Sequence, residues 1–472
     1  MKTYLKTGGS LLAFLLVMGL LLSFLGMRMS RPDFASNYYA AGSVFEGMYG
    51  LKEDSLDVLF LGSSHGYNSY DPQLLYDVSG LRGYNLSTSR QGPVVSYYWL
   101  KEVLKTQSPR AVVFEVCFLF HDTDEPSLRI ALDPMHLSGN KLEAIRELSS
   151  LDPELYDPLS FIFPLIRYHE RWKEPRANFF QEKMTHGQNW LKGYFPGFNV
   201  FNEGEDYVPF QQASTEMIPG AEMDVPDEYS LSCLNRMADL CSREGITLIL
   251  SSSPSTLWTA GQHNFMADYA SSHGIPFYDF NSAEIYRAID YDINTENLDT
   301  GHPNVLGAAK ITTWLGDQLT GQYGLTGKED AQWVISRPYT SVVAENFAVY
   351  SANTLEEYLK VAQKDHYTIF LTIDKEYEAS PESLAELEKL GIEWAPGQSV
   401  CACIDYPSGS VRQEEVFLEG TYDEELFKYS LSLEKSRASI ILNRKQRVTN
   451  DKHLHICVFD NVFRHLVDSS AF

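Results

Sequence analysis

Short apolar runs recur along the first part of the chain, and stretches with helical spacing of apolar residues separate them. The apolar runs cover residues 57–62, 111–116, 246–250 and 276–280, and the helical stretches include 96–105 and 227–244. Alternation of this kind is typical of a parallel sheet covered by helices on both faces. Ligands bind at the carboxyl ends of the strands in such sheets, so we expect the chemistry in the loops after these runs.

The composition indicates a folded protein that does not bind nucleic acid. At roughly 100 to 200 residues per domain, the 472 residues make two or three domains, and 44% hydrophobic residues suffice for a packed core. Acidic residues number 63 against 38 basic ones, and the net charge is −25. We therefore expect no nucleic-acid partner, because proteins that bind nucleic acids carry clustered positive charge.

The N-terminal segment has the length and composition of a membrane span. Residues 7–27 carry no charge, Lys2 and Lys6 precede them, and Arg28 and Arg31 follow. We interpret residues 1–31 as a cytoplasmic stub and an uncleaved signal anchor, and a cleaved signal peptide is the alternative. The acidic remainder is expected outside the cell, on a bacterial cell membrane, as the body of a single-pass protein.

Two changes of composition divide the rest of the chain. Residues 121–225 interrupt the alternation with Pro, aromatic and charged clusters, and we interpret them as an insertion within a domain at 32–320. Residues 319–327 are rich in Gly and indicate a linker. Beyond them, residues 335–472 are predicted to form a smaller α+β accessory domain.

The six cysteines do not indicate a metal site. Buried thiols are one interpretation, and a disulfide between Cys457 and either Cys401 or Cys403 is the other. The chain has no pair of C-x-x-C motifs and no H-E-x-x-H, so we expect no zinc.

Two short motifs suggest nucleophilic catalysis. The first apolar run leads directly into Gly62-Ser-Ser-His-Gly66, where glycines allow a tight turn around a serine hydroxyl. Far downstream, Asp299 precedes His302 by three residues, just before a helical stretch. An Asp at this spacing can orient an imidazole that takes a proton from a serine.

Together these motifs resemble the SGNH, or GDSL-type, hydrolase superfamily over residues 55–320. The resemblance implies a three-layer, flavodoxin-like parallel sheet, no cofactor, and Ser64, His302 and Asp299 as nucleophile, general base and its partner. Ser63 replaces the usual Asp of the first motif. It does so too in the membrane-anchored branch that resembles the teichoic-acid D-alanine transfer protein and the alginate O-acetylation proteins.

The resemblance also implies an oxyanion hole. The backbone amides of Ser64 and Ser87 are expected to donate, with Ser87 standing where Gly is usual, and the side chains of Asn85 and Gln91 either join them or cap turns. The G-x-N-D block typical of the superfamily is missing after residues 111–116, where Glu115 stands instead, so the third oxyanion donor is open.

Four further residues are candidates for substrate binding. Trp258 and His263 follow the run at 246–250, Asn304 follows His302, and His65 follows the nucleophile. Trp258 would stack on a sugar ring or else pack in the core, and His65 has packing as its alternative role.

The function that these features predict is an O-acyltransferase or acyl-esterase. It would be tethered outside the cell and would modify a cell-surface polysaccharide or teichoic-acid-like polymer through an acyl-enzyme on Ser64. The resemblance favours transfer, beside a membrane-bound O-acyltransferase as partner. A non-catalytic glycan-binding or scaffold protein and a plain secreted carbohydrate esterase are the alternatives. The C-terminal part resembles the interleukin-like EMT inducer domain, which implies a role in carbohydrate or partner binding.

Overall fold

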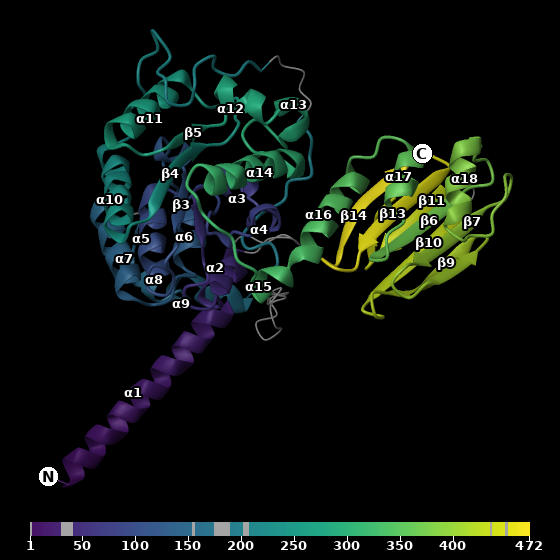
Figure 1. The fold of residues 1–472 in the computed structure, drawn as a ribbon. Helices are drawn as coiled ribbons and strands as arrows, with labels where there is room; N and C mark the ends of the chain where they lie inside the picture. Colours follow the sequence, from purple (N-terminus) through teal and green to yellow (C-terminus); the bar gives the residue numbers. More distant parts are fainter. Residues whose placement is uncertain are drawn as a thin grey trace. The chain divides into compact units, whose positions relative to one another are not determined.

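The computed structural model describes residues 2–29, 41–152, 156–173, 189–201, 207–434, 437–448 and 452–472 (Figure 1). The chain divides into two compact units, Met1–Ser336 (unit 1) and Arg337–Phe472 (unit 2). The predicted boundary between residues 31 and 32 lies outside the described residues, as do parts of the predicted insertion at 121–225.

Unit 1 begins with a long apolar helix, α1 (Lys2–Met29). Its window Gly9–Gly26 makes it, among the described residues, the one helix long and apolar enough to cross a membrane. Its large side chains are exposed along this window, with Leu12, Leu16 and Leu20 each at least 64% exposed.

The centre of unit 1 is a parallel sheet of five strands. In spatial order they are β2 (Gly83–Asn85), β1 (Val58–Leu61), β3 (Ala111–Glu115), β4 (Thr247–Ser252) and β5 (Phe277–Asp279). This order, 2-1-3-4-5, is that of flavodoxin-like sheets. The expectation of a parallel sheet is confirmed, and β2 is a short edge strand that we did not predict.

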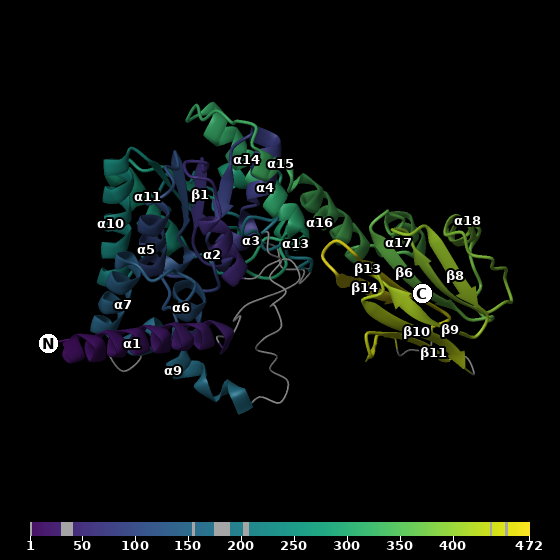
Figure 2. The same ribbon diagram turned by 90° about the horizontal axis from the view of Figure 1, so that it is seen from below.

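Helices cover both faces of this sheet (Figures 1 and 2). Leu59 and Leu61 point to one face and Val58 and Phe60 to the other, because successive side chains of a strand alternate. The first face packs against α2 (Ala41–Tyr49), α5 (Pro93–Val103), α6 (Glu125–Leu132), α7 (Gly139–Leu151), α10 (Glu228–Glu244) and α11 (Ala260–His273). The second packs against α4 (Pro72–Ser79), α12 (Ala283–Ala288), α13 (Ile293–Glu296) and α14 (Val305–Gly321).

The shorter elements of unit 1 complete it around these layers. They are α3 (Ser64–Ser69) after β1, η1 (Cys117–Leu119) after β3, α8 (Pro158–Ile162), α9 (Leu165–Tyr168), η2 (His169–Lys173) and α15 (Ala331–Val334). The predicted linker at 319–327 is partly the end of α14. The rest lies along unit 1, where the Arg110 side chain donates to the carbonyl of Thr326 at 2.7 Å.

Unit 2 has three layers, with helices on one face of a five-stranded sheet and a second sheet on the other. The five strands are β14 (His465–Ala471), β13 (Leu454–Asp460), β6 (Tyr367–Ile373), β7 (Val400–Asp405) and β8 (Ser410–Glu414), all antiparallel. The helices are α16 (Arg337–Tyr350), α17 (Leu355–Val361) and α18 (Pro381–Lys389). The second sheet holds β12 (Lys445–Gln446), β11 (Arg437–Leu442), β10 (Phe427–Glu434) and β9 (Phe417–Tyr422).

All six cysteines are free thiols. Cys403 on β7 and Cys457 on β13 both lie opposite Phe370 of β6, so a whole strand separates them. Two strand spacings, about 9.5 Å, exceed the reach of a disulfide. Cys401, Cys403 and Cys457 instead pack between the two sheets. The alternative of a disulfide to Cys457 is therefore wrong, and five of the six thiols are buried.

Candidate active site

The turn after β1 places Ser64 at the first position of α3. Gly62 has a φ of +148°, which disfavours a side chain, and a Cβ there would lie only 2.7 Å from the Cβ of Glu115. The Ser63 hydroxyl caps α3 by accepting a hydrogen bond from the N–H of His65 at 3.3 Å. The chain thus turns sharply at the end of the strand and leaves Ser64 half-buried at the carboxyl edge of the sheet.

His302 and Asp299 lie on the loop between α13 and α14, and this loop meets Ser64. The Nε2 atom of His302 is 2.8 Å from Ser64 Oγ, and its Nδ1 atom is 2.9 and 3.0 Å from the two carboxylate oxygens of Asp299. Burial alone would raise the pKa of Asp299, but hydrogen bonds from His302 and the Gly301 N–H outweigh it and the pKa is lowered. An ionised carboxylate at this position fixes the ring with Nε2 toward Ser64.

Neighbouring loops hold the Asp299–His302 turn in place. Asn304 caps α14 by accepting from the N–H groups of Leu306 and Gly307 at 2.9 and 3.2 Å. Its side-chain amide donates to the carbonyl of Thr295 at 2.8 Å. From the loop after β4, the N–H of Thr256 donates to the carbonyl of Thr300 at 2.8 Å. The base is therefore positioned by the ends of three elements.

A buried carboxyl lies behind the nucleophile turn. Glu115, at the end of β3, accepts hydrogen bonds from the Ser63 hydroxyl and from the N–H of Cys117, both at 2.9 Å. Its side chain is buried, and burial raises its pKa to about 7 in spite of these hydrogen bonds. Glu115 thus ties the Ser63–Ser64 turn to the neighbouring strand, and we did not predict this role.

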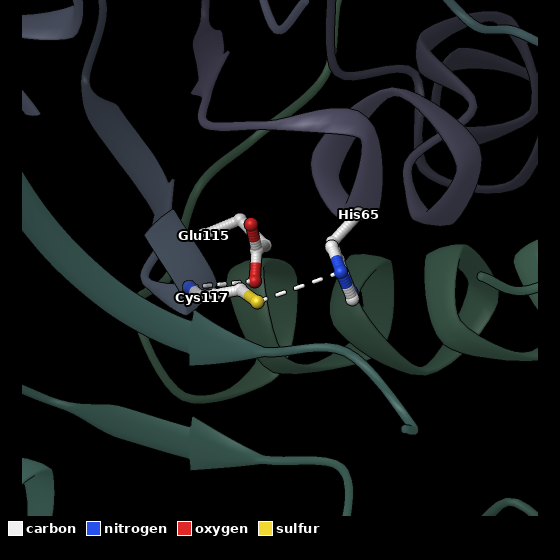
Figure 3. A group of neighbouring side chains, drawn as sticks. All are labelled: His65, Glu115 and Cys117. Atoms are coloured by element: carbon white, nitrogen blue, oxygen red, sulfur yellow. Dashed lines mark hydrogen bonds between the residues drawn. The ribbon is translucent and has the colours of Figure 1, made fainter. Parts of the chain in front are cut away.

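His65 and Cys117 lie beside this carboxyl (Figure 3). The Sγ atom of Cys117 is 3.4 Å from Nε2 of His65, and the ring of His65 is 4.6 Å from that of His302. Burial and the nearby His302 lower the pKa of His65 to about 3, so its ring is neutral. Burial raises the pKa of the Cys117 thiol, which therefore stays protonated.

Among the residues that the structure describes, two groups of side chains have atoms close enough to ligate a metal ion. His65, Glu115 and Cys117 place their ligand atoms within 4.8 Å of one another, and each already has a hydrogen-bond or close polar partner in the cluster. The second group, in unit 2, consists of Asp374, Glu376 and His453.

Tyr67 is a further residue of the site that we did not predict. It follows Ser64 by three positions on α3, so the two side chains share a face of the helix. Its phenol hydrogen-bonds with the Ser64 hydroxyl, and burial raises the pKa of the phenol, which keeps its proton. Its ring packs edge-to-face against Phe195, with the centroids 5.2 Å apart. The spacing from Ser64 was the one signal in the sequence.

The predicted oxyanion donors of the loop after β2 are occupied. The N–H of Ser87 donates to Oδ1 of Asn85 at 3.0 Å, and the amide of Asn85 donates to the carbonyls of Gly66 and Tyr70. The amide of Gln91 donates to the hydroxyl of Ser96 at 3.0 Å. Asn85 and Gln91 are buried, Asn85 links its loop to α3, and Gln91 hydrogen-bonds to the start of α5, in line with the alternative of a structural role. The oxyanion role of Ser87, Asn85 and Gln91 stays a prediction. Of the predicted donors, the N–H of Ser64 remains, at a helix position with no intrahelical acceptor.

The residues predicted to contact substrate are all buried, which for Trp258 and His65 agrees with the alternative of packing, and substrate contact by the others stays a prediction. His263 has no exposed surface, and its Nδ1 atom lies 2.5 Å from Asp279. Trp258, 7% exposed, donates to the same carboxylate at 3.1 Å. Asn304 is buried as the cap of α14. Only His65 lies close to His302 and Ser64, and it is 6% exposed.

Comparisons with known proteins give distant structural likenesses only. No family model matches the chain, and no curated protein matches it. One similar structure is a putative acylhydrolase from Bacteroides fragilis, with 12% identity over 59% of this chain and 95% of the other, at a TM-score of 0.28. A GDSL-like lipase from Bacteroides thetaiotaomicron has 14% identity over 60% of this chain and 100% of the other, also at 0.28.

A third similar structure is a gut microbial diltiazem-metabolizing enzyme, with 11% identity over 57% of this chain and 48% of the other, at a TM-score of 0.21. TM-scores this low do not establish a common fold. The chemistry of the site therefore rests on the positions of its own atoms.

Proposed function

We propose that the chain is a serine acyl-transfer enzyme, with Ser64 as nucleophile, His302 as general base and Asp299 as the group that orients the base. One observation carries this proposal. Two stretches 238 positions apart meet so that His302 Nε2 lies 2.8 Å from Ser64 Oγ while Nδ1 faces an ionised carboxylate. This is the arrangement that activates a serine hydroxyl for attack on an acyl carbonyl.

The reaction would proceed in two halves. Ser64 Oγ attacks the carbonyl carbon of an ester while His302 Nε2 takes the hydroxyl proton, and the same proton then passes to the leaving oxygen. The result is an acyl ester on Ser64. In the second half His302 takes a proton from an acceptor hydroxyl or from water, and the oxygen of that group bonds to the acyl carbon. The bond between the acyl carbon and Ser64 Oγ then breaks, and His302 returns the proton to Ser64 Oγ. The N–H of Ser64 and the phenol of Tyr67 are the donors placed to stabilise the oxyanion.

We further infer that the acceptor is a hydroxyl of a cell-surface polysaccharide or teichoic-acid-like polymer. The resemblance to the membrane-anchored branch supports transfer over hydrolysis. The apolar helix α1 and the acidic remainder of the chain support a single-pass anchor with the site outside the cell. In this proposal a membrane-bound O-acyltransferase supplies the acyl group, and unit 2 binds carbohydrate or a partner.

Labelling with a fluorophosphonate tests the nucleophile. The probe should label the full-length wild type in detergent at Ser64, and Ser64→Ala and His302→Ala should abolish labelling. Ser150→Ala is the matched control, because the Ser150 hydroxyl donates to the carbonyl of Arg146 on the exposed side of α7 and takes no part in the nucleophile turn. Labelling that persists in Ser64→Ala, or a folded wild type that does not react, contradicts the proposal. An inert wild type would favour the non-catalytic scaffold.

A second experiment separates transfer from hydrolysis. The wild type is incubated with an activated acyl ester and an oligosaccharide acceptor, and both acylated acceptor and free acid are quantified. Acylated acceptor that depends on Ser64 is the expected product. Free acid released at the same rate with and without acceptor would identify a plain esterase.

A further inference from the structure

The segment of α8 and α9, within the predicted insertion at 121–225, carries exposed apolar side chains, and α9 contacts α1. Leu159 on α8 is 56% exposed, Phe163 after α8 is 54% exposed, and Ile166 on α9 is 47% exposed. We call these three side chains the α8–α9 patch. Single exposed apolar residues are common on soluble proteins, whereas three such residues within eight positions are typical of a surface that contacts another molecule or a membrane.

The segment that carries the patch is fixed to unit 1. Phe161, between Leu159 and Phe163, is 1% exposed and packs in the core. Arg167, next to Ile166, donates to both carboxylate oxygens of Asp133 at 2.7 Å, and its guanidinium lies over the ring of Phe161. The patch therefore points outward because its neighbours hold it there.

The end of the apolar window of α1 contacts the same segment. Gly26, its last residue, is buried, and a Cβ at this position would lie 3.8 Å from the backbone nitrogen of Leu165 on α9. Both views show α9 beside the end of α1 that is nearest the sheet (Figures 1 and 2). The segment that carries the patch thus lies against the end of the surface that α1 offers to a membrane.

The length of α1 sets the depth of the patch. The 18-residue window Gly9–Gly26 measures about 27 Å at 1.5 Å per residue, close to the roughly 30 Å of a bilayer core. Gly26 then lies where hydrocarbon meets the headgroups, and α9 lies there with it. Apolar side chains at this level lower their free energy when they leave water and enter the boundary between headgroups and acyl chains.

We propose that the α8–α9 patch is a second membrane contact, in which Leu159, Phe163 and Ile166 insert into the outer leaflet of the bilayer that α1 crosses. This inference rests on the proposed anchor. Together with α1, this contact attaches unit 1 to the membrane at two points. It restricts rotation of the rest of unit 1 about the axis of α1. The occupant is lipid, because the segment that carries the patch lies against the end of the lipid-facing surface of α1.

Depth-dependent quenching tests this contact in the full-length protein. Phe163→Cys and Ile166→Cys are made in a Cys117→Ser background, which removes the one native thiol that is not buried. Each variant is labelled with the fluorophore NBD and reconstituted into vesicles of phosphatidylethanolamine and phosphatidylglycerol that contain doxyl lipids. Leu306→Cys is the control, because Leu306 is 45% exposed and α14 lies away from α1 in both views.

Shallow doxyl lipids should quench the label at 163 and 166 by about twofold or more and leave the label at 306 unchanged, as expected for side chains at the interface. Equal quenching at all three positions, with the chain resistant to carbonate extraction, overturns the patch and leaves the anchor intact. A chain that carbonate extracts overturns both. If the NBD fluorescence at 163 and 166 shows an apolar environment but doxyl lipids do not quench it, the patch contacts protein and the lipid contact is overturned. Thermal unfolding confirms that each variant is folded.

Discussion

Replacing the buried carboxyl behind the nucleophile turn should change how stability depends on pH. Burial raises the pKa of Glu115 from its ordinary 4.5 to about 7. A carboxyl whose pKa is raised by folding stabilises the folded state fully below its unfolded pKa, and this contribution is lost as the pH rises through the folded value. Wild-type stability should therefore fall between about pH 4.5 and 7 through this group.

The magnitude follows from the difference between the two pKa values. The difference between the ordinary pKa and the raised pKa corresponds to about 3 kcal/mol, and most of it falls between pH 5 and pH 8. Glu115→Gln keeps a similar shape and an oxygen for the N–H of Cys117 but does not ionise. As the pH rises over this range, the free energy of unfolding of Glu115→Gln should therefore increase relative to that of the wild type by about 2 to 3 kcal/mol.

Urea denaturation at both pH values measures this gain. Six of the seven tryptophans lie in unit 1, so a Trp394→Phe background lets fluorescence report that unit alone. Asp71→Asn is the matched control, because burial also raises the pKa of Asp71 to about 7, at the cap of α4 and not behind Ser63. It should show a similar gain without a change in the labelling of Ser64. If the difference between wild type and Glu115→Gln is equal at pH 5 and pH 8, the reasoning is refuted.

Three further substitutions test the site. Asp299→Asn should slow fluorophosphonate labelling by about 10² to 10⁴, because the amide favours the wrong tautomer of His302; an unchanged rate would remove Asp299 from the mechanism. Tyr67→Phe should slow labelling about tenfold, in line with one lost hydrogen bond of about 1.4 kcal/mol to the oxyanion, and a large drop in the thermal midpoint would show a structural role instead. Asn304→Ala should lower the free energy of unfolding by about 1 kcal/mol in urea for the lost cap, and no change would mean that water replaces the cap.

Much of the architecture of unit 1 could be predicted because its strands are buried on both faces. Continuous apolar runs marked β1, β3, β4 and β5 to within a few residues. β2 was not predicted because it has only three residues, too few to show an apolar run or an alternation of apolar and polar residues. For residues 335–472 the sequence predicted only an α+β domain and not its two sheets, because the pairing of antiparallel strands depends on contacts between distant segments.

The candidate site could be predicted only in part. Ser64, Asp299 and His302 stand out in the sequence because short motifs and turn chemistry mark them. The roles of Asn85 and His263 do not stand out, because the sequence does not show which group a polar side chain will hydrogen-bond to in the folded chain. The carbonyls around Asn85 and the carboxylate of Asp279 beside His263 become neighbours only in the folded chain. Burial thus decides which polar residues of a loop remain available to a ligand.

The division of the chain into two units has a consequence for engineering. Ser64, Asp299 and His302, together with the residues that hold their loops, all come from the segment that ends at Ser336. Replacing the segment after Ser336 by another domain leaves all residues of the proposed site in the chain. Chimeras with other C-terminal domains therefore test the role proposed for unit 2 while these three residues stay in place.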